Sequence, residues 1–237
     1  MTHILAIDTS SAWCSVALSL DNAAPVARHQ KVSAGASQLL LPWVQELLSE
    51  ASIKLADLDA IAIGIGPGAF TGVRLGVAAV QGLATAACLP VLSVASLDAI
   101  ASQLVQTPAF IASGAQSFVV AVDARMGEVY WASYRVGTNL LPVRQGDIHL
   151  TAPEGVELSQ IDFLAGSAIT EFGDRLFTTA PRPFSSTRLD STVGVNALGV
   201  LACAQAMWSQ GLQQDVHLLE PLYIRNKVAL TSAERGQ

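Results

Sequence analysis

The sequence is poor in charged residues. Only 14% of its 237 residues are Asp, Glu, Lys or Arg, against about 25% in typical domains, while 51% are hydrophobic. This balance excludes a disordered chain, which needs low hydrophobicity and high net charge. A basic excess is also missing, because 19 acidic against 13 basic residues give a net charge of −6, which argues against nucleic-acid binding by this chain alone. So few charges predict that a partner covers part of the surface.

Cysteine and histidine are also scarce. The three cysteines lie far apart among apolar neighbours, and the four histidines are isolated from one another. Neither a disulfide framework nor a zinc site is therefore expected, and no other metal site is predicted. Buried, reduced thiols are typical of a cytoplasmic protein, which is the localisation that we expect. The sequence has no GxSxG segment, and no serine or cysteine can be matched to a histidine as nucleophile and base.

No segment is predicted to direct the chain into a membrane. The first residues, MTHILAIDTS, lack the basic region of a signal peptide and reach Asp8 early. Residues 75–97 carry no charge and are long enough to cross a bilayer. This stretch is rich in alanine, however, and Pro90 interrupts it. We therefore predict a buried helix followed by a buried strand.

Hydrophobic periodicity predicts alternating strands and helices in the first hundred residues. Short apolar or alternating runs predict strands over residues 3–8, 15–20, 26–31, 60–66 and 91–94. Helical spacing predicts a helix that begins at Ser37 and has an apolar face wider than one stripe. A second helix is expected from about Phe70 to Cys88, before Pro90, and a third begins at Ser96 or Asp98.

A similar pattern starts again near residue 117. Residues 118–123 form an apolar run that ends in Asp123, as residues 3–8 end in Asp8, and each run is followed by a short turn and a second strand. This weak repeat predicts an α/β protein of two lobes, each with a mixed sheet flanked by helices. Chance similarity of two apolar hairpins is the alternative. With the seam between residues 106 and 116, we expect an N-terminal lobe of residues 1–106 and a C-terminal lobe of residues 107–237 that ends in a C-terminal tail.

A glycine-rich segment, GIGPGAFTG, occupies residues 64–72 between a predicted strand and a predicted helix. Its backbone amides could approach an anion, but it matches neither GxxxxGK[ST] nor a clean GxGxxG, so a rigid turn that packs the helix on the sheet is slightly favoured. Because a glycine inside a helix costs about 1 kcal/mol relative to alanine, close packing is expected along the helix that follows. The neighbour is either the chain's own sheet or helix, or a helix of another subunit. The small residues form one stripe: Gly72, Gly76, Ala79, Gly82 and Ala86.

Asp8 and Asp123 both stand where a predicted strand ends and a turn begins. They either face each other across a cleft and hold metal and phosphate, or each caps its own turn. The residues after Asp8, TSS at positions 9–11, suit a phosphate hairpin. Arg125 and Met126, after Asp123, are bulky where a phosphate loop needs small residues.

Four segments together resemble the TsaB family, also called YeaZ. They are LAIDTS at residues 5–10, GPGAFTGVRLG at 66–76, DARMGEVY at 123–130 and PLYIR at 221–225, so the resemblance covers nearly the whole chain. It implies the actin-like ATPase superfold of two ribonuclease-H-like lobes. It also implies an accessory subunit, not an enzyme, that works with TsaD and TsaE in the cytoplasm. Together these proteins transfer threonylcarbamoyl from threonylcarbamoyl-AMP to N6 of the adenosine beside the anticodon in tRNAs that read codons beginning with A.

The resemblance further implies how the partners divide the work. TsaD is the catalytic, metal-binding relative, and TsaE is an ATPase that binds the pair. The tRNA would be met only indirectly, through the complex. The chain would pair with TsaD through the first two helices of the N-terminal lobe, and would form a homodimer when alone. The implied partner-binding residues are Leu39, Leu40, Trp43, Val44 and Leu47 on one helix, and Gly72, Gly76, Ala79 and Leu83 on the other.

Departures from the catalytic relatives favour a subunit without a catalytic or metal site. The HxxxH metal pair of TsaD has no match, since residues 36–43 read ASQLLLPW, and a lone Gly166 stands where nucleotide-binding relatives have two glycines. No tightly bound cofactor is expected, and ATP or ADP is expected only in complex with partners. The alternative is an ATP-dependent kinase or phosphotransferase of the same superfold, with Asp8 as base or metal anchor. The residues expected beside a nucleotide are Asp8, Thr9, Ser10, Gly66, Gly68 and Thr71.

Overall fold

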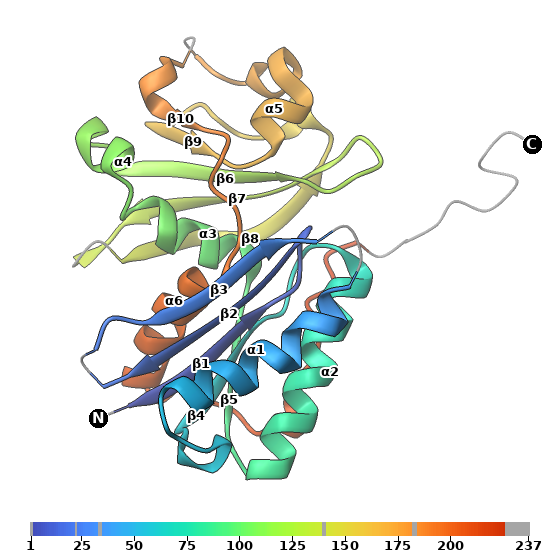
Figure 1. Cartoon of the computed structure of the whole chain (residues 1–237). Coiled ribbons are helices and arrows are strands. Elements are labelled where there is room, and N and C mark those ends of the chain that lie inside the picture. Colours follow the sequence, from blue (N-terminus) through green and yellow to red (C-terminus); the bar gives the residue numbers. More distant parts are fainter. Residues whose placement is uncertain (1, 22, 33–34, 139–140, 182–183, 226–237) are drawn as a thin grey trace, which may run out of the picture.

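Each predicted hairpin forms inner strands of a five-stranded sheet (Figure 1). The structure is a computed structural model and describes residues 2–21, 23–32, 35–138, 141–181 and 184–225. In the first sheet the strand order is β3-β2-β1-β4-β5, with β1 antiparallel to β2 and parallel to β4. These strands are β1 (His3–Asp8), β2 (Trp13–Leu20), β3 (Val26–Lys31), β4 (Ala60–Gly64) and β5 (Val91–Val94).

The second sheet repeats this arrangement. Its order is β10-β9-β6-β7-β8, with β6 antiparallel to β7 and parallel to β9. The repeat predicted from the two Asp-terminated strands is therefore confirmed, and with it the α/β fold of two lobes with mixed sheets. The strands are β6 (Ser117–Asp123), β7 (Val129–Val136), β8 (Pro142–Thr151), β9 (Phe163–Ala165) and β10 (Leu189–Asp190).

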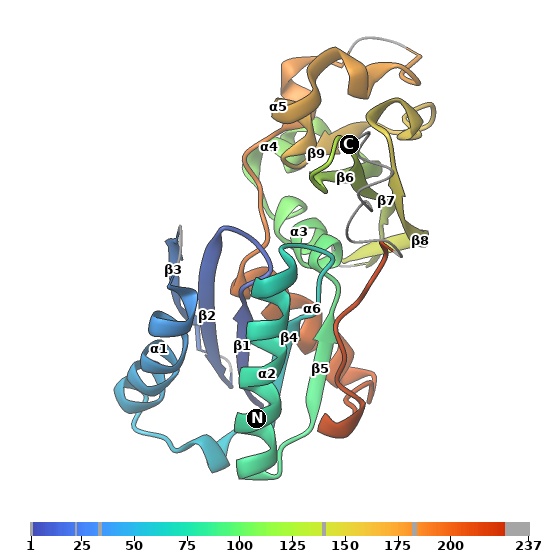
Figure 2. The same cartoon turned by 90° about the vertical axis from the view of Figure 1, so that its right-hand side faces the viewer.

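Helices cover both faces of the first sheet (Figure 2). On one face lie α1 (Ala36–Glu50) and α2 (Phe70–Ala87), while α6 (Ala197–Ser209) packs on the other. Between α6 and the second sheet lies α3 (Ser96–Leu104). The remaining short helices are α4 (Pro108–Ser113), α5 (Ala168–Phe172) and the 3₁₀ turns Leu55–Asp57, Pro153–Gly155, Gly173–Phe177, Ser186–Arg188 and Val216–Leu218.

Alternation along β4 decides which helix packs on which face of the first sheet. Successive side chains of a strand point to opposite faces. Ile61 and Ile63 therefore join the core beneath α1 and α2, while Ala60 and Ala62 join the core beneath α6. The small alanines leave room for α6 to approach the sheet closely. Because both faces are covered, the strand reads as a continuous apolar run.

After building the second sheet, the chain returns to the first lobe. The backbone N–H of Ala197, at the start of α6, donates to Ser15 Oγ of β2 (2.9 Å). Beyond α6, Gln214 pairs with Val91 of β5, and the Leu222 N–H donates to the Ile65 carbonyl (2.8 Å). The prediction that residues 107–237 form the second lobe is therefore corrected for residues 197–222, which complete the first lobe. A division of the chain at one point in the sequence could not predict this return, because it places every later residue in the second lobe.

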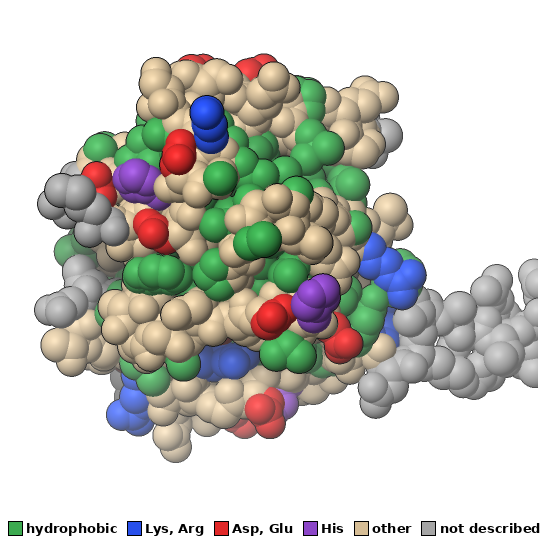
Figure 3. Space-filling view, turned by 90° about the horizontal axis from the view of Figure 1, so that it is seen from below, with side chains coloured by type: hydrophobic (Ala, Val, Ile, Leu, Met, Phe, Trp, Pro, Cys, Tyr) green, Lys and Arg blue, Asp and Glu red, His purple; other side chains and the backbone are tan. Residues whose placement is uncertain are grey.

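The surface reflects the scarcity of charge. Seen from below (Figure 3), hydrophobic side chains, other uncharged side chains and backbone make up most of the visible surface, and charged side chains are few and scattered. No helix within the described ranges is both long and apolar enough to span a membrane. The uncharged stretch 75–97 forms most of α2, then strand β5 and the first residues of α3, which confirms the predicted helix and strand. The helix is buried on one side only, because Gln81, Gly82 and Ala86 are exposed.

Candidate functional site

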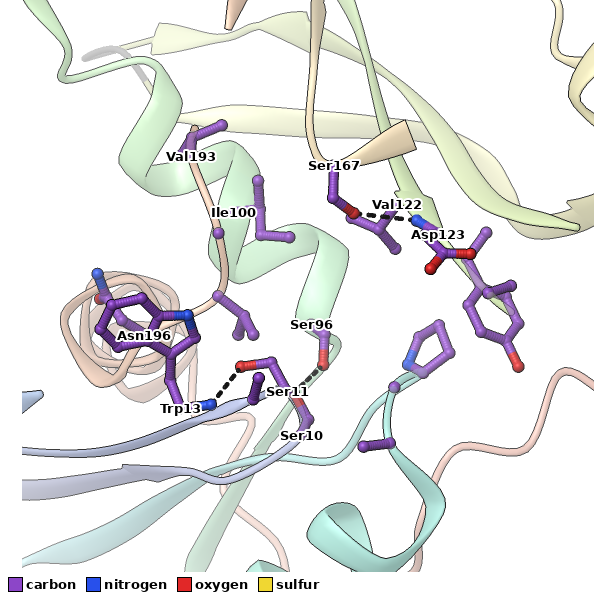
Figure 4. A pocket seen from close by; sticks show the side chains of 18 of the residues that line it. Ser10, Ser11, Trp13, Ser96, Ile100, Val122, Asp123, Ser167, Val193 and Asn196 are labelled. Atoms are coloured by element: carbon purple, nitrogen blue, oxygen red, sulfur yellow. Dashed lines mark hydrogen bonds between the residues drawn. The ribbon is translucent and has the colours of Figure 1, made fainter. Parts of the chain in front are cut away.

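A cleft of about 730 Å³ lies between the two lobes (Figure 4). This volume is typical of ligand-binding sites. Both hairpins reach it: Ser10, Ser11 and Trp13 come from the first lobe, and Asp123 and Arg125 from the second. Further lining residues are Gly68 of the loop before α2, Ser96 and Gln103 of α3, and Val193 and Asn196 of the segment that leads into α6.

Asp8 lies beneath the floor of this cleft and does not line it. Its side chain is completely buried. One carboxylate oxygen accepts from the Ser10 N–H (3.1 Å), and the other accepts from Ser10 Oγ (2.9 Å), which also contacts Ser96 Oγ (3.0 Å). Burial is the main cause that raises the Asp8 pKa, to about 7, and the hydrogen bonds from Ser10 lower it only in part. Burial disfavours the charged form of this enclosed carboxyl group, which makes it a poor anchor for a metal ion.

The glycine-rich segment lies directly against the Asp8 hairpin. A Cβ atom at Gly64 would overlap an Asp8 carboxylate oxygen, and one at Gly68 would overlap the Ser10 carbonyl oxygen. The Ala69 N–H donates to that same carbonyl (2.6 Å). Gly66 has a φ of 96°, which glycine adopts at little cost. Close packing of this loop on its own hairpin accounts for the glycines, in agreement with the rigid turn that the spacing favoured.

The glycines of the α2 stripe pack against the same hairpin. Thr9 Oγ1 donates to the Gly72 carbonyl (2.7 Å), and a Cβ at Gly72 would overlap the Thr9 carbonyl oxygen. A Cβ at Gly76 would lie 2.7 Å from Thr9 Oγ1 and 2.9 Å from Ile63 Cδ1. The prediction that Gly72 and Gly76 contact a partner is therefore corrected: the chain's own first hairpin and β4 fill that space.

The second hairpin holds its own aspartate. Asp123 accepts from the Arg125 N–H (2.7 Å) and forms an ion pair with the Arg125 guanidinium (3.1 Å). Of the two alternatives for Asp123, the structure supports a cap on its own turn. Asp123 does line the cleft, but Asp8 does not face it there. Among the described residues, no group of three or more His, Cys, Asp or Glu side chains could hold a metal ion.

An aromatic pair at the cleft was not predicted from the sequence. The rings of Trp13 and His29 stack with centroids 4.5 Å apart and planes 3° from parallel, and both line the cleft. The pair forms because β2 and β3 pair antiparallel with Ser15 opposite His29, which places Trp13 diagonally across from the histidine. Burial lowers the His29 pKa. The register of β2 against β3 would have revealed the pair, and the sequence predicts the two strands but not their register.

The remaining predicted partner residues divide into inward and outward groups. Leu40, Val44 and Leu47 are almost completely buried in the core between α1 and the sheet, which corrects their assignment to a partner surface. Other apolar residues of α1 and α2 are only half-buried, and five of them are spaced by four along their helix, so that each set lines one side of it. We call them the α1–α2 face: Leu39, Trp43, Leu75, Ala79 and Leu83. Thr71, expected beside a nucleotide, is exposed and does not line the cleft.

Comparison with known proteins connects this architecture to one family. The model of the TsaD family, described as tRNA N6-adenosine threonylcarbamoyltransferase, matches residues 30–185. The tRNA threonylcarbamoyladenosine biosynthesis protein TsaB of Escherichia coli is 36% identical over 96% of both chains, and that of Haemophilus influenzae is 33% identical over 95% of this chain and 94% of the relative. The solved structure of YeaZ from Pseudomonas aeruginosa superposes with a TM-score of 0.80 at 34% identity, over 94% of this chain and all of that one.

Proposed function

The chain belongs to the TsaB family, within the wider TsaD family whose model it matches, and from that premise we propose that it is a non-catalytic subunit in tRNA threonylcarbamoyladenosine biosynthesis. In this proposal it pairs with TsaD and with the ATPase TsaE in the cytoplasm. The complex transfers threonylcarbamoyl from threonylcarbamoyl-AMP to N6 of the adenosine next to the anticodon, in tRNAs that read codons beginning with A. The chain meets tRNA only through the complex.

One observation carries the non-catalytic part of the proposal: both candidate catalytic aspartates are engaged within the chain. Asp8 is enclosed by protein and hydrogen-bonded by Ser10. Asp123 is held by the backbone and side chain of Arg125. Phosphoryl transfer depends on a positioned base and on carboxylates that hold a metal ion. With both aspartates engaged in this way, this chain would have to contribute by organising its partner.

The α1–α2 face supports pairing as the means of that contribution. Its side chains are apolar and only half-buried, and α2 carries a single charged residue, Arg74, in 18 residues. Rows of side chains four apart form the ridges by which one helix packs on another. Such a face suits a second pair of helices, either from TsaD or, when TsaD is absent, from another copy of this chain.

A phosphotransferase of the same superfold is the second candidate, and the size and hydroxyl lining of the cleft favour it. The charges in the cleft do not favour it. Among the described residues, Arg125 is the only Lys or Arg that lines the cleft, and it is already paired with Asp123. A triphosphate would need more positive charge than this arrangement supplies. If calorimetry on the purified chain detected tight, magnesium-dependent ATP binding, this second candidate would replace the first.

The pairing proposal is tested by a single substitution on the α1–α2 face. Leu83→Arg places a charge on the face and should abolish co-elution with TsaD in size-exclusion chromatography, because the charge would have to be buried without a partner. The matched control is Leu212→Arg, at an exposed leucine beyond α6, which should leave co-elution unchanged. Normal co-elution of a folded Leu83→Arg variant would contradict the proposal.

A further inference from the structure

The last described residues, 214–225, form a strap that contains the 3₁₀ turn Val216–Leu218 and connects the first lobe to the second hairpin. In Figure 2 it rises beside β5 and α2 and reaches the second lobe. Gln214 pairs with Val91 at its start, Leu219 is buried in the core beneath α2, and the Leu222 N–H donates to the Ile65 carbonyl. The strap is therefore fixed along its length and is not a loose end.

One polar anchor of the strap lies on the first turns of α2. Tyr223 Oη accepts a hydrogen bond from Arg74 Nε (2.9 Å). The Arg74 guanidinium lies 3.8 Å from the centroid of the Phe70 ring and 5.7 Å from that of the Tyr223 ring. These contacts combine a hydrogen bond with cation–π attraction. They tie the strap to the helix that carries half of the α1–α2 face.

The other polar anchor lies on the turn between β6 and β7. Arg225 Nη2 donates to the carbonyls of Ala124 (3.1 Å) and Arg125 (3.3 Å), and to Glu128 Oε2 (2.5 Å). The Arg225 side chain is 15% exposed. Arg125 and Met126 have φ values of 63° and 57°, a left-handed backbone that is unfavourable for residues other than glycine. A phosphate hairpin points its backbone amides at an anion. This turn instead points its carbonyl oxygens at the Arg225 guanidinium.

Alternation along the strap makes the two anchors act together. Leu222 and Ile224 pack against the apolar core that spans both lobes, while Tyr223 and Arg225 make the polar contacts. Two extended residues span only about 7 Å. The chain between Tyr223 at the α2 anchor and Arg225 at the hairpin anchor is therefore short, so one anchor cannot move far without the other.

We propose that the strap couples the start of α2 to the β6–β7 turn and so holds the two sides of the cleft at a fixed separation. The cleft is lined on one side by residues 67–69, immediately before α2, and on the other by residues 122–125. The strap binds next to both segments. A protein that binds α2 would then change the cleft through the strap. This consequence rests on the proposed pairing with TsaD, but the coupling between the two anchors does not.

Hydrogen–deuterium exchange of the full chain tests the coupling at the β6–β7 turn. The Ala124 and Glu128 amides are hydrogen-bonded across this turn. Arg225→Ala should speed exchange of the peptide that contains them by about tenfold or more, because it removes charge-assisted hydrogen bonds to the turn. Arg74→Ala removes no contact to the turn, yet it should also speed exchange there by at least about threefold, because it releases the other end of the strap.

The control is Arg175→Ala, which breaks an exposed ion pair to Glu154 in the second lobe and should leave the turn unchanged. Peptides of β9 serve as the reference for global unfolding. If Arg225→Ala destabilises the whole chain, Arg225→Lys, which keeps the charge but lacks the forked donors, should give a smaller rise confined to the turn. If the exchange rate of the turn peptide were unchanged in Arg74→Ala, the coupling would be overturned. An unchanged rate in both Arg225 variants would overturn it as well. These readouts need no TsaD, so they are independent of the proposed function.

Discussion

At the scale of single residues, the Asp8 carboxyl group is the most unusual feature of the chain. It is fully buried, and its side-chain hydrogen bonds come from Ser10. Within the part of the chain that the structure describes, no Lys, Arg or His pairs with it. Gly64, on the neighbouring strand β4, is in contact with Asp8, and any side chain at this position would collide with the carboxylate. The surroundings of Asp8 therefore favour its neutral form.

This burial predicts a pH-dependent stability. The pKa of Asp8 is raised from 3.8 to about 7 in the folded chain, so the folded state binds the proton more tightly than the unfolded state does. The stability that this supplies is complete below about pH 4 and is lost as pH rises to about 7. Asp8→Asn should remove this dependence and become the more stable protein near pH 8, by an amount on the order of a few kcal/mol. Urea unfolding from pH 4 to pH 8 measures the difference, and parallel curves for the two proteins would show that the carboxyl is not buried as described.

Sequence reasoning located Asp8 and Asp123 correctly at the ends of equivalent strands, because an apolar run followed by a turn is visible in the sequence. It left open whether they face a cleft, because their orientation depends on contacts distant in sequence. Asp8 is in contact with Gly64, and its hydrogen-bond partner Ser10 contacts Ser96; both are more than fifty residues away. The stacking of Trp13 on His29 escaped prediction for a similar reason, since it depends on the register of two strands.

At the scale of elements, the first two glycines of the small-residue stripe on α2 mark the side of the helix that packs against the chain's own first hairpin. Periodicity predicted the extent of this helix well, from about Phe70 to Cys88, against the observed Phe70–Ala87. It could not decide what approaches the glycines, because a close contact within the chain and one between subunits give the same sequence pattern. The structure places Gly76 against the first hairpin, while a Cβ at Gly82 would meet no atom within 4 Å.

Two alanine substitutions on this one helix should therefore have opposite effects. Gly76→Ala pushes a methyl group against Thr9 and Ile63 and should lower the free energy of unfolding by about 1–3 kcal/mol. Gly82→Ala, on the open side, should raise it by up to about 1 kcal/mol through helix propensity. Thermal unfolding followed by circular dichroism compares them. Equal melting temperatures would mean that Gly76 does not face the hairpin.

At the scale of the whole molecule, the two lobes share one apolar core. It contains Ile4 and Ala62 of the first sheet together with Phe118 and Phe163 of the second, with α3 and α6 between them. A hydrogen bond from Tyr134 Oη to Asp98 (2.8 Å) also joins β7 to α3. The duplicated architecture could be predicted from the repeat, but the shared core could not, because it depends on the return of α6 to the first sheet.

A shared core predicts that the lobes do not unfold separately. Scanning calorimetry of the full chain should show one transition with equal calorimetric and van't Hoff enthalpies. A fragment of residues 1–106 lacks α6, so the alanine face of its sheet is exposed, and it should not give a cooperative transition. Two separate transitions in the full chain, or a stably folded fragment, would instead support two independent lobes divided at residue 106.

The central claim is that this chain supports the modification of tRNA without performing the chemistry. The most direct measurement is a reconstitution of TsaD, TsaE, ATP, threonylcarbamoyl-AMP and unmodified tRNA, with the modified nucleoside quantified by mass spectrometry. We predict that product requires this chain and forms at an unchanged rate with Asp8→Asn. Loss of a general base would lower the rate by about 100-fold or more. Such a loss in an Asp8→Asn complex that still assembles would contradict the non-catalytic assignment.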